Sequence, residues 1–539
     1  RSPLDDYVNA IDPAYKWDIR SRVDGAGFTK YNLRLTSGTW RTSAEVNNPL
    51  WQHWLVLYVP DVITNNKALL FIDGGSASST PPTTEIDPYA GGVAIASGMV
   101  LADLLNVPNQ PLTFAGESSS RSEDSIIAYS WRKYLETGDP TWPVNLPMTR
   151  AAMRAMDAIS DFVGSPVGGN IDLESFIVSG ASKRGWTTWL ASATDPRVSF
   201  AVPVVADLLN MEPSFVHHYA YYNGTFSTAV RDYVNEGILN INNFGKDNIK
   251  SLLSIVDPFT YKDRLTLPKF ILNASGDEFF VPDSWQFYYD QLPGPKWIRY
   301  IGNTGHGISD PLLLLDAFTL LIGVADGYQP PSYSFTQLAD GTIEVQTSGT
   351  IADAKLFQAT NVNAREFRYA AVGGIFTNTN LTDQGGGVFR GNVPTPAQGW
   401  TAYFIQLSFP IPTGGLATVS SGVYFKGPPV NKQPIVTTTP DTVVTEGSFA
   451  VPVVATDPDT NQTLTYSLDP GGPAGVSINP VTGIVSGFAI DQLGLLAPIT
   501  VVVSDNGTPV ISYRDTFRIT VVNAAPTAGI IAQTAAVRG

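Results

Sequence analysis

The sequence predicts an α/β domain with a mostly parallel sheet, followed by two β-sandwich domains. Between about residues 54 and 325, short β-type runs alternate with helical stretches, which is the pattern of a parallel sheet covered by helices. The helical patterns stop after residues 329–331, Gln-Pro-Pro, and alternating strands continue to about Pro428. A Pro-bearing stretch at residues 427–434 precedes a third segment, whose strands are separated by Asp, Asn and Gly turns.

The expected elements and boundaries follow in chain order. Strands of the first domain are expected at residues 54–59, 68–72, 176–179, 198–205, 269–274 and 296–301, and helices at residues 186–193 and 311–321. Strands of the two sandwiches are expected at residues 342–346, 400–407, 442–454, 463–468 and 499–503. We therefore expect an α/β domain over residues 1–327, a β-sandwich over 328–427, a linker at 428–437, a second sandwich over 438–523 and a tail at 524–539.

The composition excludes several functional classes. Of the 539 residues 43% are apolar and 15% are charged, and the 48 Gly and 40 Pro are typical of a turn-rich, β-heavy, extracytoplasmic chain. The 33 Lys and Arg against 48 Asp and Glu give a net charge of −15, which disfavours nucleic acid or an anionic membrane as a partner. Cysteine is absent, which excludes thiol nucleophiles, Cys-ligated zinc, iron–sulfur clusters and disulfides. No apolar run approaches the length of a membrane span, and Arg1 in place of Met indicates a processed or trimmed start.

A candidate nucleophile lies between an expected strand and an expected helix. The segment Gly180-Ala-Ser182-Lys-Arg-Gly185 follows the strand at residues 176–179 directly. A serine on such a turn is pushed out above the sheet edge, and the small neighbours let the strained turn form. The spacing is G-x-S-x-x-G instead of the usual G-x-S-x-G, so the motif needs support from a base and an acid.

Four histidines compete for the role of base. His306 follows the strand at residues 296–301 and precedes the helix at 311–321, which is where the histidine of a Ser–acid–His triad belongs. His53 lies on an early strand and is expected to be a packed histidine. His217 and His218 lie in an aromatic insertion and are expected in a lid that contacts substrate.

The acid is expected in the loop after the strand at residues 269–274. Asp277 is the first carboxylate past that strand, and Gly276 permits the turn. Glu278 and Asp283 in the same loop are alternative candidates for the acid, and Asp207, which follows the strand at residues 198–205, is a further candidate. The sequence thus favours Ser182, Asp277 and His306 as the triad.

Acyl transfer also needs donors for the developing oxyanion. One is expected to be the backbone N–H of Lys183, and the other to come from Gly75 or Ser76 after the strand at residues 68–72. Asp73 in that loop would oppose the negative charge if it pointed inward. Arg184 is a candidate for binding a substrate carboxylate, although cations early in a helix more often pair with neighbouring acids, here those at residues 123–124.

These and other segments of the chain resemble the family of PhoPQ-activated pathogenicity-related proteins, a secreted branch of the α/β-hydrolase superfamily. The resemblance spans roughly residues 3–427. The matching segments include Leu4-Asp-Asp-Tyr7, Thr39-Trp-Arg41, Trp51-Gln-His-Trp54, Arg121-Ser-Glu-Asp124, Trp142-Pro, Leu146-Pro-Met148, Gly180-Ala-Ser-Lys-Arg-Gly-Trp186, Gly276-Asp-Glu-Phe-Phe280 and Gly399-Trp-Thr-Ala402. The resemblance implies a secreted α/β-hydrolase domain fused to a β-sandwich, with Ser182, Asp277 and His306 at the triad positions.

The segment from about residue 436 to 523 resembles a cadherin-like or related bacterial immunoglobulin-like module. The resemblance rests on Ala455-Thr-Asp457-Pro-Asp459, Leu464-Thr-Tyr-Ser-Leu468, Pro480-Val-Thr-Gly483 and Val503-Ser-Asp505-Asn-Gly507. It implies a spacer or adhesion element that contacts a surface or a polymer. Asp457, Asp459 and Asp505 are candidate calcium ligands, but Gln492 stands where the family has glutamate, which favours turn-forming aspartates.

The sequence therefore predicts a secreted, cell-surface or periplasmic serine hydrolase that cleaves an ester or amide bond through an acyl-enzyme. An ester is slightly preferred over a peptide, no cofactor is required, and calcium is confined to the C-terminal module. The alternative is an extracellular binding or signalling protein that keeps a hydrolase fold with little turnover.

Overall fold

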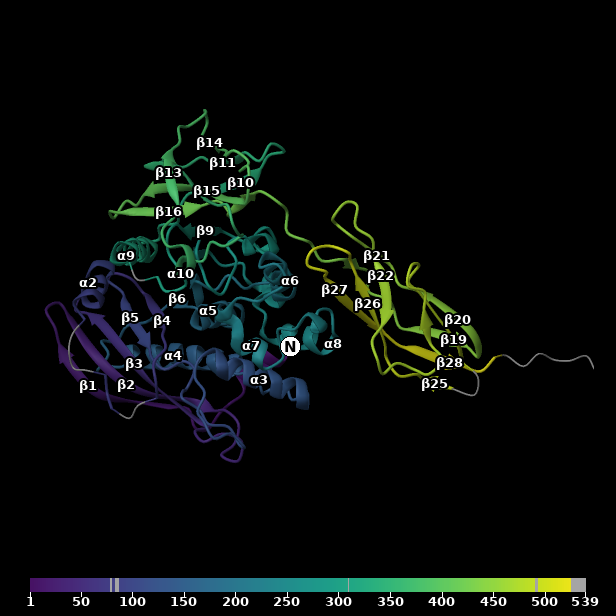
Figure 1. The fold of residues 1–539 in the computed structure, drawn as a ribbon. Coiled ribbons are helices and arrows are strands. Elements are labelled where there is room, and N and C mark those ends of the chain that lie inside the picture. Colours follow the sequence, from purple (N-terminus) through teal and green to yellow (C-terminus); the bar gives the residue numbers. More distant parts are fainter. Residues whose placement is uncertain (78–79, 83–86, 309, 490–492, 525–539) are drawn as a thin grey trace, which may run out of the picture. The chain divides into compact units, whose positions relative to one another are not determined.

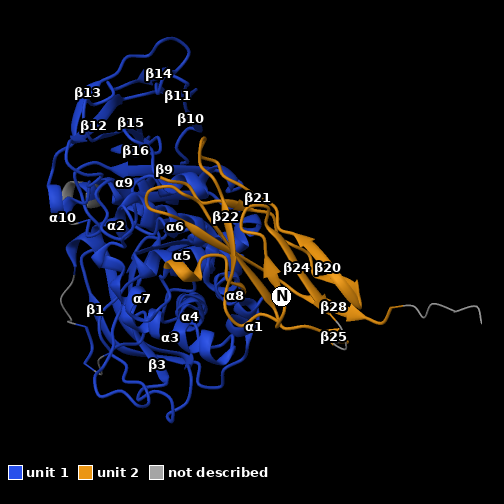
Figure 2. Ribbon diagram, turned by 45° about the vertical axis from the view of Figure 1, so that its right-hand side comes forward, with its two compact units in different colours: residues 1–240, 248–430 blue, residues 241–247, 431–539 orange. Residues whose placement is uncertain are grey.

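A computed structural model describes residues 1–77, 80–82, 87–308, 310–489 and 493–524. The chain divides into two compact units, coloured separately in Figure 2. Unit 1 comprises residues 1–240 and 248–430, and unit 2 comprises residues 241–247 and 431–539. The expected tail, Asp491 and Gln492 lie outside the described residues.

Unit 1 is built on a mixed nine-stranded sheet with the order β1-β2-β3-β5-β4-β6-β7-β8-β9 (Figure 1). Its strands are β1 Lys16–Asp24, β2 Phe28–Thr39, β3 Leu50–Pro60, β4 Lys67–Ile72, β5 Val100–Leu104, β6 Ser175–Ala181, β7 Val198–Val204, β8 Lys269–Ala274 and β9 Lys296–Ile301. From β1 to β5 the pairs are antiparallel, and from β5 to β9 they are parallel. All carboxyl ends of the parallel strands therefore meet at one edge.

Helices cover both faces of this sheet. Successive strand residues point to opposite faces, so apolar side chains on each face pack against helices. Leu70 and Val178 face a core shared with α3, α4 and α5, whereas Leu69 and Ile177 face a second core shared with α2 and α9. The helices of unit 1 are α1 Pro3–Asn9, α2 Pro88–Ser97, α3 Asp124–Thr137, α4 Asn145–Gly164, α5 Lys183–Thr194, α6 Met211–Tyr221, α7 Arg231–Asn235, α9 Pro311–Ala325 and α10 Tyr369–Val372, while α8 spans Asp247–Val256.

The bounds of α2 illustrate why these segments are helical. The side chain of Asp87 accepts a hydrogen bond from the backbone N–H of Tyr89, which caps the helix, and Pro88 occupies the first turn where no N–H is needed. The helix ends at Gly98, whose φ of 61° lies in the left-handed region. The local sequence alone thus fixes both ends of α2.

A β-sandwich follows α9 within unit 1. One sheet has the order β10-β11-β14, and the other has the order β13-β12-β15-β16 with β17 paired to β15. The strands are β10 Tyr333–Gln337, β11 Ile343–Thr347, β12 Asp353–Asn361, β13 Thr377–Asn380, β14 Val388–Gly391, β15 Trp400–Pro410, β16 Leu416–Ser420 and β17 Tyr424–Lys426. This sandwich and the α/β part belong to one compact unit, so side chains of the sandwich can support a site in the α/β part. The expected domain boundary between residues 327 and 328 stays a prediction.

Unit 2 is a small β-sandwich of paired short strands. They are β18 Ile435–Val436, β19 Thr442–Thr445, β20 Gly447–Pro452, β21 Ala455–Thr456, β22 Thr465–Leu468, β23 Ser477–Ile478, β24 Ile484–Ala489, β25 Gly494–Leu495, β26 Ile499–Ser504, β27 Ser512–Phe517 and β28 Ile519–Val522. Val485, Val501 and Ile519 are fully buried members of its core.

Two expectations about strands were wrong. Residues 442–454 form two strands, because β19 pairs with β28 and β20 pairs with β24 in another sheet, and Gly447 with a φ of 129° lets the chain cross between them. The strands expected for the first domain also omitted β1, β2 and β5. Of these, β1 alternates between exposed and half-buried residues as an edge strand, which gives a weak apolar signal.

Candidate active site

Ser182 lies on a strained turn between β6 and α5. Its φ of 60° and ψ of −123° are unusual for a residue other than glycine. The close packing of the turn explains its two glycines: a Cβ at Gly180 would lie 2.6 Å from the carbonyl oxygen of Arg184, and one at Gly185 would lie 2.7 Å from the carbonyl oxygen of Val204. The turn therefore presents Ser182 at the carboxyl edge of the sheet, as expected for a nucleophile elbow.

The structure brings Ser182, His306 and Asp277 together from three separate loops. The Oγ of Ser182 lies 2.7 Å from Nε2 of His306. The other ring nitrogen, Nδ1, lies 2.9 Å from Oδ2 and 3.0 Å from Oδ1 of Asp277. With Nδ1–H donating to the carboxylate, Nε2 is left as the acceptor for the serine hydroxyl. This arrangement can transfer the serine proton to the imidazole.

The surroundings hold both partners of this pair in place. Asp277 is 3% exposed, and its Oδ1 also accepts the backbone N–H groups of Phe279 at 2.7 Å and Phe280 at 3.1 Å. The ring of Phe279 packs against the imidazole with 4.3 Å between centroids. Burial opposes a charge on His306, but the charge and hydrogen bond of Asp277 outweigh it, so the pKa of His306 is raised above 6.5.

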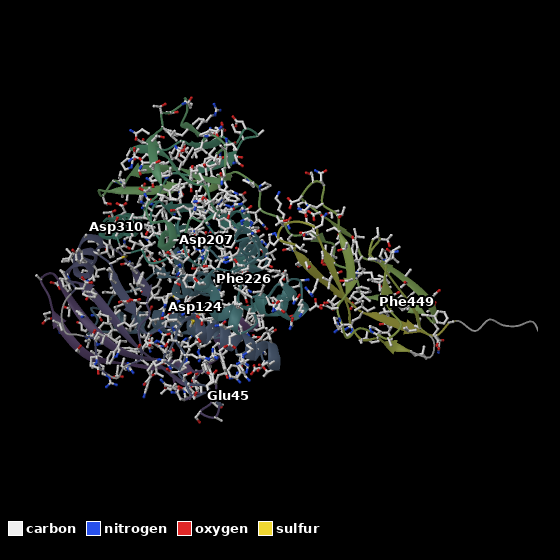
Figure 3. The ribbon with its side chains drawn as sticks, in the orientation of Figure 1. Glu45, Asp124, Asp207, Phe226, Asp310 and Phe449 are labelled. Carbon is white, nitrogen blue, oxygen red and sulfur yellow. The ribbon has the colours of Figure 1, made fainter. Side chains whose placement is uncertain are left out.

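The rival carboxylates occupy other positions. Asp207 is fully buried and accepts hydrogen bonds from the hydroxyls of Tyr288 at 2.7 Å and Tyr300 at 2.6 Å, and its burial raises its pKa to about 7. Asp283 lies 2.9 Å from Nε2 of His217 and 3.2 Å from Arg365. Of the candidate acids, Asp277 is therefore the one whose carboxylate contacts the imidazole ring of His306. Figure 3 labels Asp207.

Glu278, the third rival, contacts the backbone of His306 and not its ring. Its Oε2 accepts the backbone N–H of His306 at 2.7 Å, and its Oε1 accepts that of Ala370 at 3.2 Å. The neighbouring Tyr369 donates its backbone N–H to the carbonyl oxygen of Gly276 at 2.9 Å. The short helix α10 of the sandwich is thereby tied to the loop that carries Asp277, a support that no sequence motif indicated.

The expected oxyanion donors lie next to the elbow. Lys183 is the first residue of α5, where a backbone N–H has no acceptor within the helix. Ile72 pairs with Gly180 in the parallel register of β4 and β6, which brings the loop with Gly75 and Ser76 to the same edge. Gly75 has a φ of 105°, which favours glycine. The carboxylate of Asp73 accepts the N–H of Gly74 at 2.7 Å, so it folds back onto its own loop.

The two cations beside Ser182 are paired with acids of the α3 start. The guanidinium of Arg184 donates two hydrogen bonds to Glu123, at 2.8 and 2.7 Å, and its Nε donates to the carbonyl oxygen of Val107 at 2.5 Å. The ammonium of Lys183 lies 3.0 Å from Glu123 and 2.9 Å from Asp124, which Figure 3 labels. The structure thus pairs Arg184 with Glu123, as expected for a cation early in a helix, and binding of a substrate carboxylate by Arg184 stays a prediction.

A glutamine that the sequence did not single out connects these groups to the oxyanion loop. Gln110 donates from Nε2 to the carbonyl oxygen of Gly75 at 2.9 Å and to Oε1 of Glu123 at 2.7 Å. Its own Oε1 accepts the backbone N–H of Glu123 at 2.8 Å. Glu123 itself has a φ of 58° and a ψ of −133°. Only the three-dimensional fold brings Gln110 to this loop, so no local signal could have found it.

The remaining histidines contact partners outside the triad. His53 is fully buried, and its Nδ1–H donates to the carbonyl oxygen of Asn106 at 3.0 Å, which leaves Nε2 to accept the hydroxyl of Ser37 at 2.9 Å. Burial lowers its pKa to about 4, as expected for a packed histidine. His218 on α6 accepts the backbone N–H of Ser227 at 3.0 Å, and burial lowers its pKa to about 3. His217 faces Asp283. The expected contact of His217 and His218 with substrate stays a prediction.

Comparison with known proteins places the chain in a family. The family described as PhoPQ-activated pathogenicity-related protein matches residues 4–368. The chain belongs to this family. Autocrine proliferation repressor protein A of Dictyostelium discoideum is 36% identical over 432 residues, which cover 76% of this chain and 86% of that protein. A putative Ig domain matches residues 433–522, so the family recognition made from the sequence is confirmed.

Solved structures similar to this family member include two hydrolases. Acetyl xylan esterase 1 of a Thermoanaerobacterium species has a TM-score of 0.42 at 15% identity and covers 60% of this chain and 94% of its own. The acylaminoacyl peptidase of Pyrococcus horikoshii has a TM-score of 0.36 at 13% identity, and the match covers 59% of this chain and 51% of the peptidase. The strand order and the Ig-domain match confirm the expected α/β domain with a mostly parallel sheet, followed by two β-sandwiches. Its assignment to the α/β-hydrolase superfamily stays a prediction.

The three candidate calcium ligands of unit 2 accept backbone N–H groups in this structure, Asp459 that of Lys432 at 2.7 Å. Asp505 accepts backbone N–H groups of Gly507 at 3.0 Å and Ile511 at 2.9 Å, and Asp457 accepts that of Asp459 at 2.8 Å. Within the described part of the chain, no group of three or more His, Cys, Asp or Glu side chains is placed to hold a metal ion. Calcium at these residues stays a prediction. The described helices include none that combines the length and apolarity needed to cross a membrane.

Proposed function

We propose that this member of the PhoPQ-activated pathogenicity-related family is a serine hydrolase that cleaves an ester or amide bond through an acyl-enzyme. The observation that carries the proposal is the continuous chain of hydrogen bonds from Ser182 through His306 to Asp277. A serine hydroxyl becomes nucleophilic only when a held base takes its proton. The strained elbow, an exposed loop beside it and the buried acid support the same chemistry.

The proposed reaction has two halves. Ser182 Oγ attacks the carbonyl carbon while its proton moves to Nε2 of His306, and the backbone N–H groups of Lys183 and Gly75 bind the oxyanion. The imidazolium then protonates the leaving alcohol or amine, whose bond to the acyl carbon breaks. In the second half His306 deprotonates water, which attacks the acyl-enzyme and releases the carboxylic acid and free Ser182. No cofactor takes part in these steps.

A fluorophosphonate probe tests this proposal directly, because it phosphonylates an activated serine. We expect the native protein to be labelled and Ser182→Ala to stay unlabelled, with Ser214→Ala as a control that keeps the label. A folded native protein that takes no label would contradict the proposal. Chromogenic esters and aminoacyl amides then separate the two substrate classes; we expect esters to be cleaved faster, and cleavage of amides alone would contradict that expectation.

The relative's name supports an alternative function of another class. A protein named Autocrine proliferation repressor protein A is 36% identical to this chain, and its name describes a repressor. This name favours the alternative, an extracellular binding or signalling protein with little turnover. The same labelling experiment separates the two, because a binding protein does not need an activated serine. We propose a secreted, cell-surface or periplasmic location in either case, with unit 2 contacting a surface or polymer.

A further inference from the structure

A large cavity in unit 1 reaches the candidate active site. It has a volume of about 790 Å³ and lies between the sheet, α2, α9 and β16. Figure 1 labels these two helices and this strand. Its floor includes alternate residues of β4, β7 and β8, which are Leu69, Phe71, Val202, Val204, Phe270 and Leu272, and β6 between them contributes Ser179 and Ala181. Ala90 of α2, Ala317 of α9 and Ala417 of β16 line the other walls. His306 and Gly307 are among its lining residues, so the cavity reaches one member of the triad.

The size of this cavity is that of a ligand-binding pocket. The volume falls in the usual range of ligand pockets, which is about 300 to 1,000 Å³. Because Leu69, Val202 and Phe270 offer no hydrogen bonds, water is a poor occupant of this floor.

The charged side chains among the described lining residues are Lys30, Asp87, Asp103, Arg299 and Asp316, and most of the other lining residues are apolar. Arg299 is paired with Asp316 at 3.5 Å. Burial, with the nearby charges of Asp73 and Asp87, raises the pKa of Asp103 to about 8, so this carboxyl is largely neutral at pH 7. An apolar chain that enters past His306 therefore meets mainly aliphatic and aromatic side chains.

We propose that this cavity binds a long alkyl chain of the ester that Ser182 cleaves. The inference rests on the proposed function and narrows its substrate class to esters with a long unbranched apolar arm. Such an arm can belong to the acyl group or to the alcohol. Its binding removes apolar surface from water, which holds the carbonyl carbon near Ser182.

Substitutions that fill the cavity test this inference. Ala90→Phe and Ala317→Phe place a ring in the cavity from two different helices, and Ala96→Phe is the matched control because Ala96 is exposed on α2. For the native protein and each variant, kcat/KM is measured on p-nitrophenyl acetate and decanoate, and on ethyl and decyl acetate. Labelling by the fluorophosphonate probe and turnover of p-nitrophenyl acetate report a folded, competent triad.

We expect the native protein and Ala96→Phe to prefer the long chain in one of the two series, which identifies the acyl or the alcohol side. Ala90→Phe and Ala317→Phe should lower that preference, measured as the ratio of kcat/KM for the long and the short ester, by about tenfold or more. The inference is overturned if all four proteins label and cleave acetate but show the same dependence on chain length in both series. Absence of both labelling and turnover in the native protein overturns the proposed function, and the inference with it.

Discussion

The contact between His306 and Asp277 sets the pH range in which the site can work. Nε2 of His306 accepts the serine proton only when the imidazole is neutral. Because Asp277 raises the pKa of His306, we expect kcat/KM to fall as the pH decreases through a value above 6.5. A pH–rate profile on a small ester measures this limb; a limb that lies near 4 or 3 would instead point to His53 or His218.

Removing the charge of Asp277 tests its role at the same scale. Asp277→Asn should lower kcat by about 10⁴-fold with the fold intact, because the orienting carboxylate is lost. Asp207→Asn is the matched control, since Asp207 is equally buried but contacts two tyrosine hydroxyls and not the ring of His306. Steady-state kinetics and circular dichroism check both variants. Near-native turnover in Asp277→Asn, with loss in Asp207→Asn or Glu278→Gln, would reassign the acid.

At the scale of elements, the start of α3 joins the elbow to the oxyanion loop. Glu123 pairs with Arg184 and Lys183 on the elbow side and with Gln110, which holds the carbonyl of Gly75, on the loop side. Its pKa is lowered to about 2: burial alone would raise it, but Arg184, Lys183 and Gln110 stabilise the charge. The carboxylate is therefore ionised wherever His306 is neutral.

Glu123→Gln should lower kcat by about ten- to a hundredfold with a smaller change in KM, because misplaced oxyanion donors weaken the transition state more than the ground state. Glu136→Gln on the same helix is the matched control; Glu136 pairs with Arg132 and Lys133 away from the elbow. Kinetics on one small ester check both. Equal kcat in Glu123→Gln and Glu136→Gln would contradict a positioning role for Glu123.

The sequence predicts part of the fold and of the candidate site. The strand and turn patterns predicted β8 and β9 at their exact bounds and placed Ser182 and His306 on the correct loops, because tight turns and buried strands leave local signals. The contacts of Gln110 with Gly75 and of Glu278 with Ala370 join segments far apart in the chain. Such contacts depend on the assembled sheet and on the sandwich, so no local pattern predicts them.

At the scale of the whole molecule, catalysis and calcium are expected to be separate. The proposed triad lies in unit 1 and uses no metal, whereas the candidate calcium ligands Asp457, Asp459 and Asp505 lie in unit 2. Removing calcium with a chelator should leave ester hydrolysis unchanged and shift, at most, the melting of unit 2. Activity assays and calorimetry with and without chelator check this expectation. Loss of hydrolysis on calcium removal would show that the two are coupled.

The central claim is that Ser182 is the nucleophile, and the most direct measurement locates the covalent bond. After labelling with a fluorophosphonate, proteolysis and mass spectrometry identify the modified residue. We predict one label for each chain, on the peptide that contains Ser182, and no label after the triad is disabled by His306→Ala. A label on any other residue, or undiminished labelling of Ser182 in His306→Ala, would contradict the account.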